Sequence, residues 1–436
     1  MGAGHRAPPV RLSTAGACGG RFGAAMRRSL SFPLAGPARV SIVSHPTPVL
    51  LDVSRLIWRA WRGQLPTGID RACLAYVRHY GDRALAVVQR GGVTRVLDRR
   101  ASAALFALLT ARPASYRRDV VRLLAPLFLF GVGAFRGSLR SLVYLNVGHT
   151  GLDRAGHERW VARTGVRAVY YVHDLIPITH PAFVREGEPD KHRARMAAVV
   201  RRGAAVLGNS EDSLTELRAF ARGIGREVPP ALCVPLGVEV GFSGAPGDNP
   251  LAGQPYFVTL GTIEGRKNHA LLLAVWRRLI AQQGAGAPKL VIIGRRGWSA
   301  DAVFRALDEE EGLRSSVVEL GACDDRALQA YLAHARALLF PSFAEGQGLP
   351  LIEALVAGTP VIASDLGVFH EVAGEIPDYR APDDEDAWLA AVRDYARPDS
   401  DARRAQRERL VHFAPVTWAE HFAQVDAWID AGFPPR

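Results

Sequence analysis

The stretch that decides the fold is FPSFAEGQGLPLIEALVAGTPVIA, residues 340–363. Its first residues predict the end of a strand, and the glycines that follow indicate a loop. Pro350 then stands at the first position of a predicted helix, where proline is best tolerated, and a further apolar run begins at Pro360. Strand, glycine-bearing loop, helix and strand in this order are typical of an open α/β sheet.

The same stretch carries two carboxylates, Glu345 in the loop and Glu353 in the helix. Backbone N–H groups at the helix start form an anion site, and Gly346 and Gly348 let a phosphate approach closely. A carboxylate beside a phosphate is repelled, so its natural partners are sugar hydroxyls. We interpret one glutamate as a ligand of a donor sugar and the other as a ligand of a nucleotide ribose. The alternative is that Glu353 complements the helix dipole and Glu345 is a solvated loop acid.

A second informative stretch is YFVTLGTIEGRKNHALLL, residues 256–273. A predicted strand runs into a turn at Gly261, followed by Arg266, Lys267 and the predicted helix cap Asn268. Adjacent cations between a strand and a helix suit a diphosphate, with a solvated basic turn as the alternative. Lys267 is one of only three lysines in a chain that otherwise uses arginine.

Together the two stretches resemble the retaining GT-B glycosyltransferases with a Glu-x7-Glu signature, family GT4. The resemblance is close over residues 256–375, looser over 48–240 and absent over 1–46. Two positions depart from the family pattern: Gln347 replaces an aromatic residue of many relatives, and Thr262 replaces an arginine of some. The resemblance implies that the donor is bound by Gly261, Arg266, Lys267, Glu345, Gly346, Gly348, Leu349 and Glu353.

The first half of the chain contributes two further candidates. In the run VYYVHDLIP a predicted strand ends with His173 and Asp174, and ligands of open α/β sheets bind beyond the carboxyl ends of strands. His173 is similar to the histidine that the family places beside the donor sugar, so the resemblance implies His173, Glu345, Arg266 and Lys267 as catalytic residues. Gly68 is similar to the glycine of the family's first loop, near diphosphate and acceptor. The alternatives are a locally hydrogen-bonded histidine and an ordinary turn glycine.

Other patterns have a simpler explanation. Ser210, in an Asn-Ser pair that resembles one of the family, is followed by two acids and is interpreted as a helix cap. The acidic run 384–386 has the spelling of a metal site but follows Pro382 at a helix start, so we interpret it as capping too. The glycines around 131–136 are too few for a dinucleotide fingerprint. Because Arg266, Lys267 and a helix start are available for the diphosphate, we predict no metal and no cofactor, with the nucleotide sugar as co-substrate.

Alternating apolar and helical segments predict an α/β protein of GT-B architecture, with two doubly wound Rossmann-like domains facing a central crevice. A length of 436 residues also exceeds what one core usually supports. The predicted parts are a disordered basic leader over 1–46, an acceptor-binding domain over 47–240, a linker over 241–254, a nucleotide-sugar domain over 255–412, and a terminal helix over 413–436 that packs back on the first domain.

Composition excludes several classes of protein. With 48% hydrophobic and 22% charged residues, the chain is not wholly disordered, and no apolar stretch reaches the roughly 18–20 residues that cross a bilayer. The four cysteines lie far apart, which argues against a disulfide scaffold or zinc site and favours the cytoplasm. The basic front of the chain contains no nucleic-acid-binding motif, so we predict no nucleic acid partner.

Charge concentrates in residues 52–140, which hold sixteen arginines and five aspartates. Within them the apolar run 123–135 is flanked by arginines on both sides. One hypothesis is peripheral docking on an anionic inner membrane face, with Leu127, Phe128 and Phe130 inserting. The alternative is a buried core helix interrupted by Pro126.

The resemblance implies transfer of a hexose, mannose favoured, from a nucleoside-diphosphate donor to a glycan or polyprenyl-diphosphate-linked acceptor in surface polysaccharide biosynthesis, such as lipopolysaccharide or capsule. A nucleotide-sugar epimerase, a phosphorylase and a non-catalytic nucleotide-sugar-binding subunit remain as alternatives. A phosphorylase needs a pyridoxal phosphate lysine, and neither Lys191 nor Lys289 has a glycine-rich context. The base, the sugar and the acceptor stay open at this point.

Overall fold

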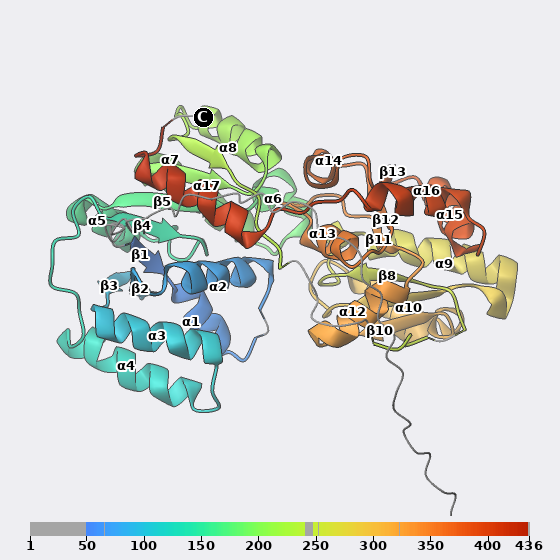
Figure 1. The fold of residues 1–436 in the computed structure, drawn as a ribbon, viewed down its shortest axis with the longest axis horizontal. Coiled ribbons are helices and arrows are strands. Elements are labelled where there is room, and N and C mark those ends of the chain that lie inside the picture. Colours follow the sequence, from blue (N-terminus) through green and yellow to red (C-terminus); the bar gives the residue numbers. More distant parts are fainter. Residues whose placement is uncertain (1–48, 65, 240–246, 252, 322, 435–436) are drawn as a thin grey trace, which may run out of the picture. The chain divides into compact units, whose positions relative to one another are not determined.

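The computed structural model describes residues 49–64, 66–239, 247–251, 253–321 and 323–434 (Figure 1). It contains two sheets, one of seven strands and one of six, each built mainly from parallel strands joined through helices. The predicted fold class is therefore confirmed. The predicted leader over 1–46 and residues 241–246 and 252 of the predicted linker lie outside the described residues.

The first sheet has the order β3-β2-β1-β4-β5-β6-β7. Every pair is parallel except β2 and β3, a hairpin that the sequence analysis missed. Its turn is Gly91-Gly92 with φ of +57° and +80°, the left-handed geometry that two-residue hairpin turns need. The strands are β1 Val49–Asp52, β2 Ala84–Arg90, β3 Val93–Val96, β4 Val143–Asn146, β5 Arg167–Val172, β6 Ala205–Gly208 and β7 Ala231–Cys233.

The second sheet has the order β10-β9-β8-β11-β12-β13, and all its pairs are parallel. The short edge strand β13 was not predicted, because its three residues are half-buried and give no apolar run. The strands are β8 Tyr256–Leu260, β9 Lys289–Ile293, β10 Val317–Leu320, β11 Leu338–Phe340, β12 Val361–Ser364 and β13 Asp378–Arg380.

The helices between the strands fall into two series. One belongs to the first lobe, which contains the seven-stranded sheet, and the other to the second lobe, which contains the six-stranded sheet. Those of the first lobe are α1 Ser54–Trp61, α2 Gly68–Tyr80, α3 Arg99–Ala111, α4 Tyr116–Phe130, α5 Ala155–Thr164, α6 Ile176–Thr179, η1 Pro181–Phe183, α7 Glu188–Arg202 and α8 Glu211–Gly223. Those of the second lobe are η2 Gly265–Lys267, α9 His269–Gln283, η3 Gly284–Gly286, α10 Asp301–Glu309, α11 Glu311–Arg314, α12 Asp325–His334, α13 Leu349–Val356, α14 Gly367–Ala373, α15 Glu385–Ala396 and α16 Asp401–Leu410.

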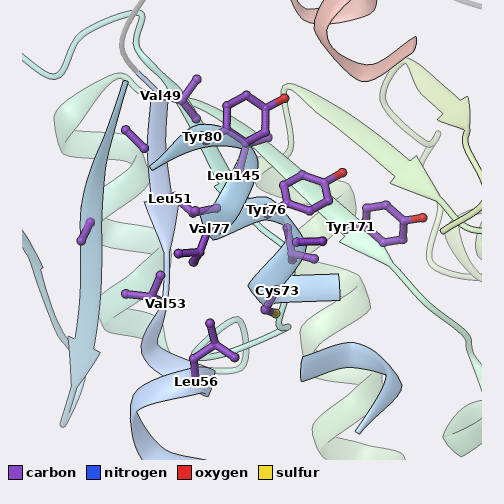
Figure 2. Packing of buried hydrophobic residues seen from close by; sticks show 14 of the residues in the cluster. Val49, Leu51, Val53, Leu56, Cys73, Tyr76, Val77, Tyr80, Leu145 and Tyr171 are labelled. Atoms are coloured by element: carbon purple, nitrogen blue, oxygen red, sulfur yellow. The ribbon is translucent and has the colours of Figure 1, made fainter. Parts of the chain in front are cut away.

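The last helix, α17 Trp418–Asp430, packs on the first lobe rather than on the second. Its buried Phe422, Val425 and Trp428 belong to the core that also contains Tyr76 of α2. Figure 2 shows this core around β1 and α2, with Tyr76 and Tyr171 among its large rings. The chain thus crosses from the second lobe back to the first at its end.

One local expectation was wrong, and another was only partly correct. Pro126 does not interrupt a helix, because α4 runs from residue 116 to 130 and contains it. Asn268 does occupy the N-cap position of α9, as predicted, but its side chain makes no capping bond there. It has φ of +54°, and its amide donates to the carbonyl of Pro382 at 2.7 Å instead.

Candidate active site

A cavity of about 750 Å³ opens where residues from both lobes converge. The volume falls within the range of small-molecule sites. Its walls come from the loops after β5, β8, β9 and β11 and from the start of α2. All ten residues that the sequence analysis singled out lie on it: Gly68, His173, Gly261, Arg266, Lys267, Glu345, Gly346, Gly348, Leu349 and Glu353.

The most buried part of the cavity wall is a cluster of ion pairs around Glu345. Its Oε1 atom lies 2.5 Å from Nζ of Lys267 and 2.9 Å from Nη1 of Arg266. The Nε atom of Arg266 lies 2.7 Å from Glu264. The side chains of Lys267 and Glu345 are each only 7% exposed. The cations therefore lie at the predicted place, but they are paired with carboxylates rather than free in a solvated turn.

The environment of this cluster fixes its protonation. Burial raises the pKa of a carboxyl group, but Arg266 and Lys267 reverse the effect and lower the pKa of Glu345 to about 2. Burial lowers the pKa of Lys267, and Glu345 opposes that shift. Glu345 is thus an anion at neutral pH. A guanidinium has five N–H donors and an ammonium three, so both cations keep donors for a further anion.

Two glycines of the loop are required by close contacts. A Cβ atom at Gly346 would lie 2.3 Å from the carbonyl oxygen of His173, so only glycine lets the loop reach the end of β5. Gly348 has φ of +82°, and a Cβ atom there would lie 2.7 Å from the ring of Phe369. The glycines therefore hold the loop against the first lobe and direct the chain into α13.

Glu353 has a different partner from Glu345. It reaches across the cavity to Arg71 of α2, with 2.5 Å between Oε1 and Nη1. The two side chains are 23% and 50% exposed. Burial is the largest influence on the pKa of Glu353 and raises it, against the opposing effect of Arg71. Sequence reasoning missed Arg71, since it lies 282 residues from its partner and belongs to no motif.

The start of α2 is fixed by Asp70, another residue that sequence reasoning missed. This buried carboxylate accepts hydrogen bonds from the backbone and hydroxyl of Thr67 at 2.7 and 2.8 Å, which forms a capping box. It also pairs with Arg55 and Arg59 of α1 at 2.7 and 2.5 Å. The Thr-x-x-Asp spacing of residues 67–70 is the sequence pattern that could have predicted this capping box. Asp70 thereby positions Gly68 close to Leu349 of α13, since a Cβ atom at Gly68 would lie 3.0 Å from the Leu349 side chain.

His173 is both a packed residue and a wall of the cavity. It is 3% exposed, and its Nε2 donates to the carbonyl of Val147 at 2.7 Å. Burial lowers its pKa to about 4, so the ring is neutral at pH 7. Since a carbonyl only accepts, the proton is on Nε2. His173 therefore lies on the cavity as predicted, and it also has the local hydrogen bond that was the alternative interpretation.

Several contacts join the two lobes beside the cavity. Gln347, the departure from the family pattern, bonds the backbone N–H and C=O of Leu236 at 3.0 and 3.1 Å. Its side chain therefore serves a contact between the lobes. Ser210 donates to the carbonyl of Gly346 at 3.0 Å, and Glu371 accepts from the first two N–H groups of α8 at 2.8 and 2.9 Å.

The two capping interpretations are confirmed. Ser210 accepts from the backbone of Ser213, and Asp384 accepts from that of Ala387. The next two acids after Asp384 pair with Arg278. Within the described ranges, no group of three or more His, Cys, Asp or Glu side chains converges in a way that could hold a metal ion.

The cavity and its fold have counterparts among known proteins. The family model described as glycosyl transferases group 1 matches residues 254–397, which include the Glu345 cluster and Glu353. Over this stretch the chain matches the group 1 glycosyltransferases, which confirms the family resemblance predicted for these residues. A crystal structure of HepE from Anabaena in complex with UDP shares the GT-B fold, with a TM-score of 0.59 and 16% identity over 88% of this chain and 100% of HepE.

Curated relatives include two mannosyltransferases of Escherichia coli. Serotype-specific mannosyltransferase WbdA is 30% identical over 260 residues, which are 54% of this chain and 31% of WbdA. O-antigen chain mannosyltransferase B is 34% identical over 169 residues, 38% of this chain and 44% of that protein. The chain thus spans about a third of the length of WbdA and less than half of the second relative.

Proposed function

We propose that this group 1 glycosyltransferase moves a mannosyl residue, with retention of configuration, from a nucleoside-diphosphate donor to a glycan or lipid-linked oligosaccharide in surface polysaccharide biosynthesis. The observation that carries the proposal is the convergence of Glu345, Lys267, Arg266, Glu353 and the start of α13 on one cavity. The UDP held by HepE supports a nucleoside diphosphate, and the names of the E. coli relatives support mannose and O-antigen synthesis.

In this proposal the second lobe holds the nucleotide and the first holds the acceptor. The remaining donors of Arg266 and Lys267, with the N–H groups that begin α13, stabilise the charge that develops on the leaving diphosphate. Glu345 orders these two cations through its ion pairs. Glu353 binds the ribose hydroxyls. The leaving phosphate accepts the proton of the acceptor hydroxyl, so no carboxylate nucleophile is needed.

The donor is tested with the purified full chain, by following release of the nucleoside diphosphate from GDP-mannose and from UDP-glucose. We expect slow hydrolysis of GDP-mannose without acceptor and a stabilisation by GDP in a thermal melt. Stabilisation by UDP and not by GDP would contradict GDP-mannose as the donor and favour another sugar. Binding of a nucleotide without any turnover, with or without glycan acceptors, would favour the non-catalytic binding subunit.

The mechanism is tested on the product. NMR should show the anomeric configuration of the donor, and an inverted product would exclude the retaining mechanism. We also propose that the cationic groups of the cavity make a divalent cation unnecessary. Activity should therefore persist in EDTA, and full loss that magnesium or manganese restores would contradict this.

A further inference from the structure

The apolar run 123–135 divides into a buried part and an exposed part. Leu124 and Leu127 belong to the core of the first lobe, at 6% and 1% exposure. The expectation that Leu127 inserts into a membrane is therefore wrong. Beyond them, at the end of α4, Leu129, Phe130 and Val132 are 72%, 78% and 61% exposed. We call these three residues the apolar tip.

The tip is unusual for the surface of this molecule. Among the described residues only seven large hydrophobic side chains are exposed, and three of them lie within the four positions 129–132. A fourth, Val121, lies on the same helix. Scattered exposed apolar residues need no explanation, but a cluster of them marks an interaction site.

Arginines surround the tip. The chain that follows α4 returns to the start of α3. The N–H of Asp98 donates to the carbonyl of Gly133 at 2.8 Å, and Leu97 forms an isolated antiparallel β-bridge with Ala134. Arg99 and Arg100 at the start of α3 therefore lie beside the tip, and Arg136 follows it directly. Figure 1 shows α3 and α4 side by side. Residues 97–140 hold eight arginines and two aspartates.

We propose that the apolar tip and its arginines dock the protein on an anionic lipid bilayer. Leu129, Phe130 and Val132 insert between headgroups, and Arg99, Arg100 and Arg136 bind lipid phosphates. No helix of the described residues is long and apolar enough to span a bilayer, so this contact is interfacial. A second copy fits less well, because a two-fold contact through this patch would bring its own arginines together. The proposal is independent of the donor and acceptor.

The test is co-sedimentation of the full chain with vesicles of phosphatidylcholine alone or with phosphatidylglycerol. We expect binding only to the anionic vesicles, weakened at high salt. The variant Leu129→Ser/Phe130→Ser/Val132→Ser should lower the partition coefficient between vesicles and water at least tenfold. It removes the three apolar side chains that would be buried in the bilayer. Val411→Ser is the matched control, since Val411 is 79% exposed at the end of α16, and it should bind as the unmodified protein does.

The charge contribution is tested separately. Arg100→Gln/Arg136→Gln should weaken binding about tenfold or more, on the scale of roughly fivefold for each arginine near anionic lipid. Arg222→Gln/Arg226→Gln, which removes two exposed arginines near the end of α8, is the control and should have little effect. Absence of binding to anionic vesicles, equal binding of the serine variant, or a dimer that this variant abolishes would each overturn the proposal.

Discussion

Glu345 and Glu353 come from one motif eight positions apart, yet the structure gives them opposite environments. Glu345 is buried, and both of its cationic partners belong to its own lobe. One of its oxygens contacts both cations, and they lower its pKa to about 2. Glu353 is partly exposed, reaches into the other lobe for Arg71, and has its pKa raised. The spacing of the motif therefore places two carboxylates on one cavity, but the neighbours decide what each carboxylate can do.

The difference separates a fixed group from an exchangeable one. Glu345 cannot leave its cations without leaving buried charges unpaired, which costs several kcal/mol. Glu353 loses less than Glu345 when its partner moves away, because the pair with Arg71 is partly exposed and fully exposed pairs contribute only about 0–1 kcal/mol. We therefore expect the Glu345 cluster to be preorganised for the leaving group, and the Glu353 pair to open when a nucleotide enters.

The largest effect is expected from breaking the Glu345 cluster. Lys267→Met should lower kcat/KM at least about 100-fold and the free energy of unfolding by about 3 kcal/mol, because it leaves Glu345 buried without its closest partner. Lys289→Met is the control, on the far end of β9 from the cavity. Turnover of donor and urea unfolding measure the two effects.

The double variant Lys267→Met/Glu345→Gln distinguishes chemistry from folding. It removes both charges of the pair, so stability should recover by at least about 1 kcal/mol relative to Lys267→Met, while activity stays at least about 100-fold low. Recovery of activity together with stability would mean that the cluster only supports the fold.

The next effect concerns the loop that joins the two carboxylates. Gln347→Leu leaves the buried N–H and C=O of Leu236 without their partners and should cost about 2 kcal/mol of unfolding free energy. The exposed Gln282→Leu on α9 is the control and should change stability by less than about 0.5 kcal/mol. An unchanged melting temperature in Gln347→Leu would show that the Leu236 contact does not hold the lobes together.

A smaller effect is expected at the exchangeable pair. Glu353→Gln should weaken binding of the nucleoside diphosphate about tenfold in calorimetry, the scale of one hydrogen bond to a charged group. Arg71→Ala should leave this affinity equal or up to about threefold tighter, because it removes a competitor for Glu353. Arg78→Ala, also on α2, is the control. Strong loss of nucleotide binding in Arg71→Ala would instead make Arg71 a ligand of the nucleotide.

The sequence predicted the second lobe better than the first for a physical reason. Around Glu345 the partners lie on two local motifs, and strand ends, glycines and proline mark where those motifs turn. Arg71 and Gln347 act through contacts with residues 282 and 111 positions away, which no local pattern encodes. The hairpin β2–β3 had a signal in Gly91-Gly92 that was missed, whereas the half-buried β13 had none.

The smallest effect tests how tightly the Glu345 side is closed. His269 begins α9 beside Lys267, is 2% exposed, and has no hydrogen-bond partner for either ring nitrogen among the described residues. Burial, with Lys267, lowers its pKa to about 3. Between pH 6.5 and 3 the unfolded chain therefore binds a proton that the folded protein refuses, so this residue makes stability fall as the pH falls.

For a single histidine this loss amounts to about 1 kcal/mol between pH 7 and pH 5.5. Other buried histidines, such as His157 and His421 with pKa values lowered to about 4, act in the same direction and set the background. His269→Phe should remove its share, so urea unfolding at the two pH values should differ by about 1 kcal/mol less than in the unmodified protein. The exposed His412→Gln is the control and should keep the full difference. An unchanged pH dependence in His269→Phe would mean that the folded protein can protonate His269, and that the Glu345 side is as open to water as the Glu353 side.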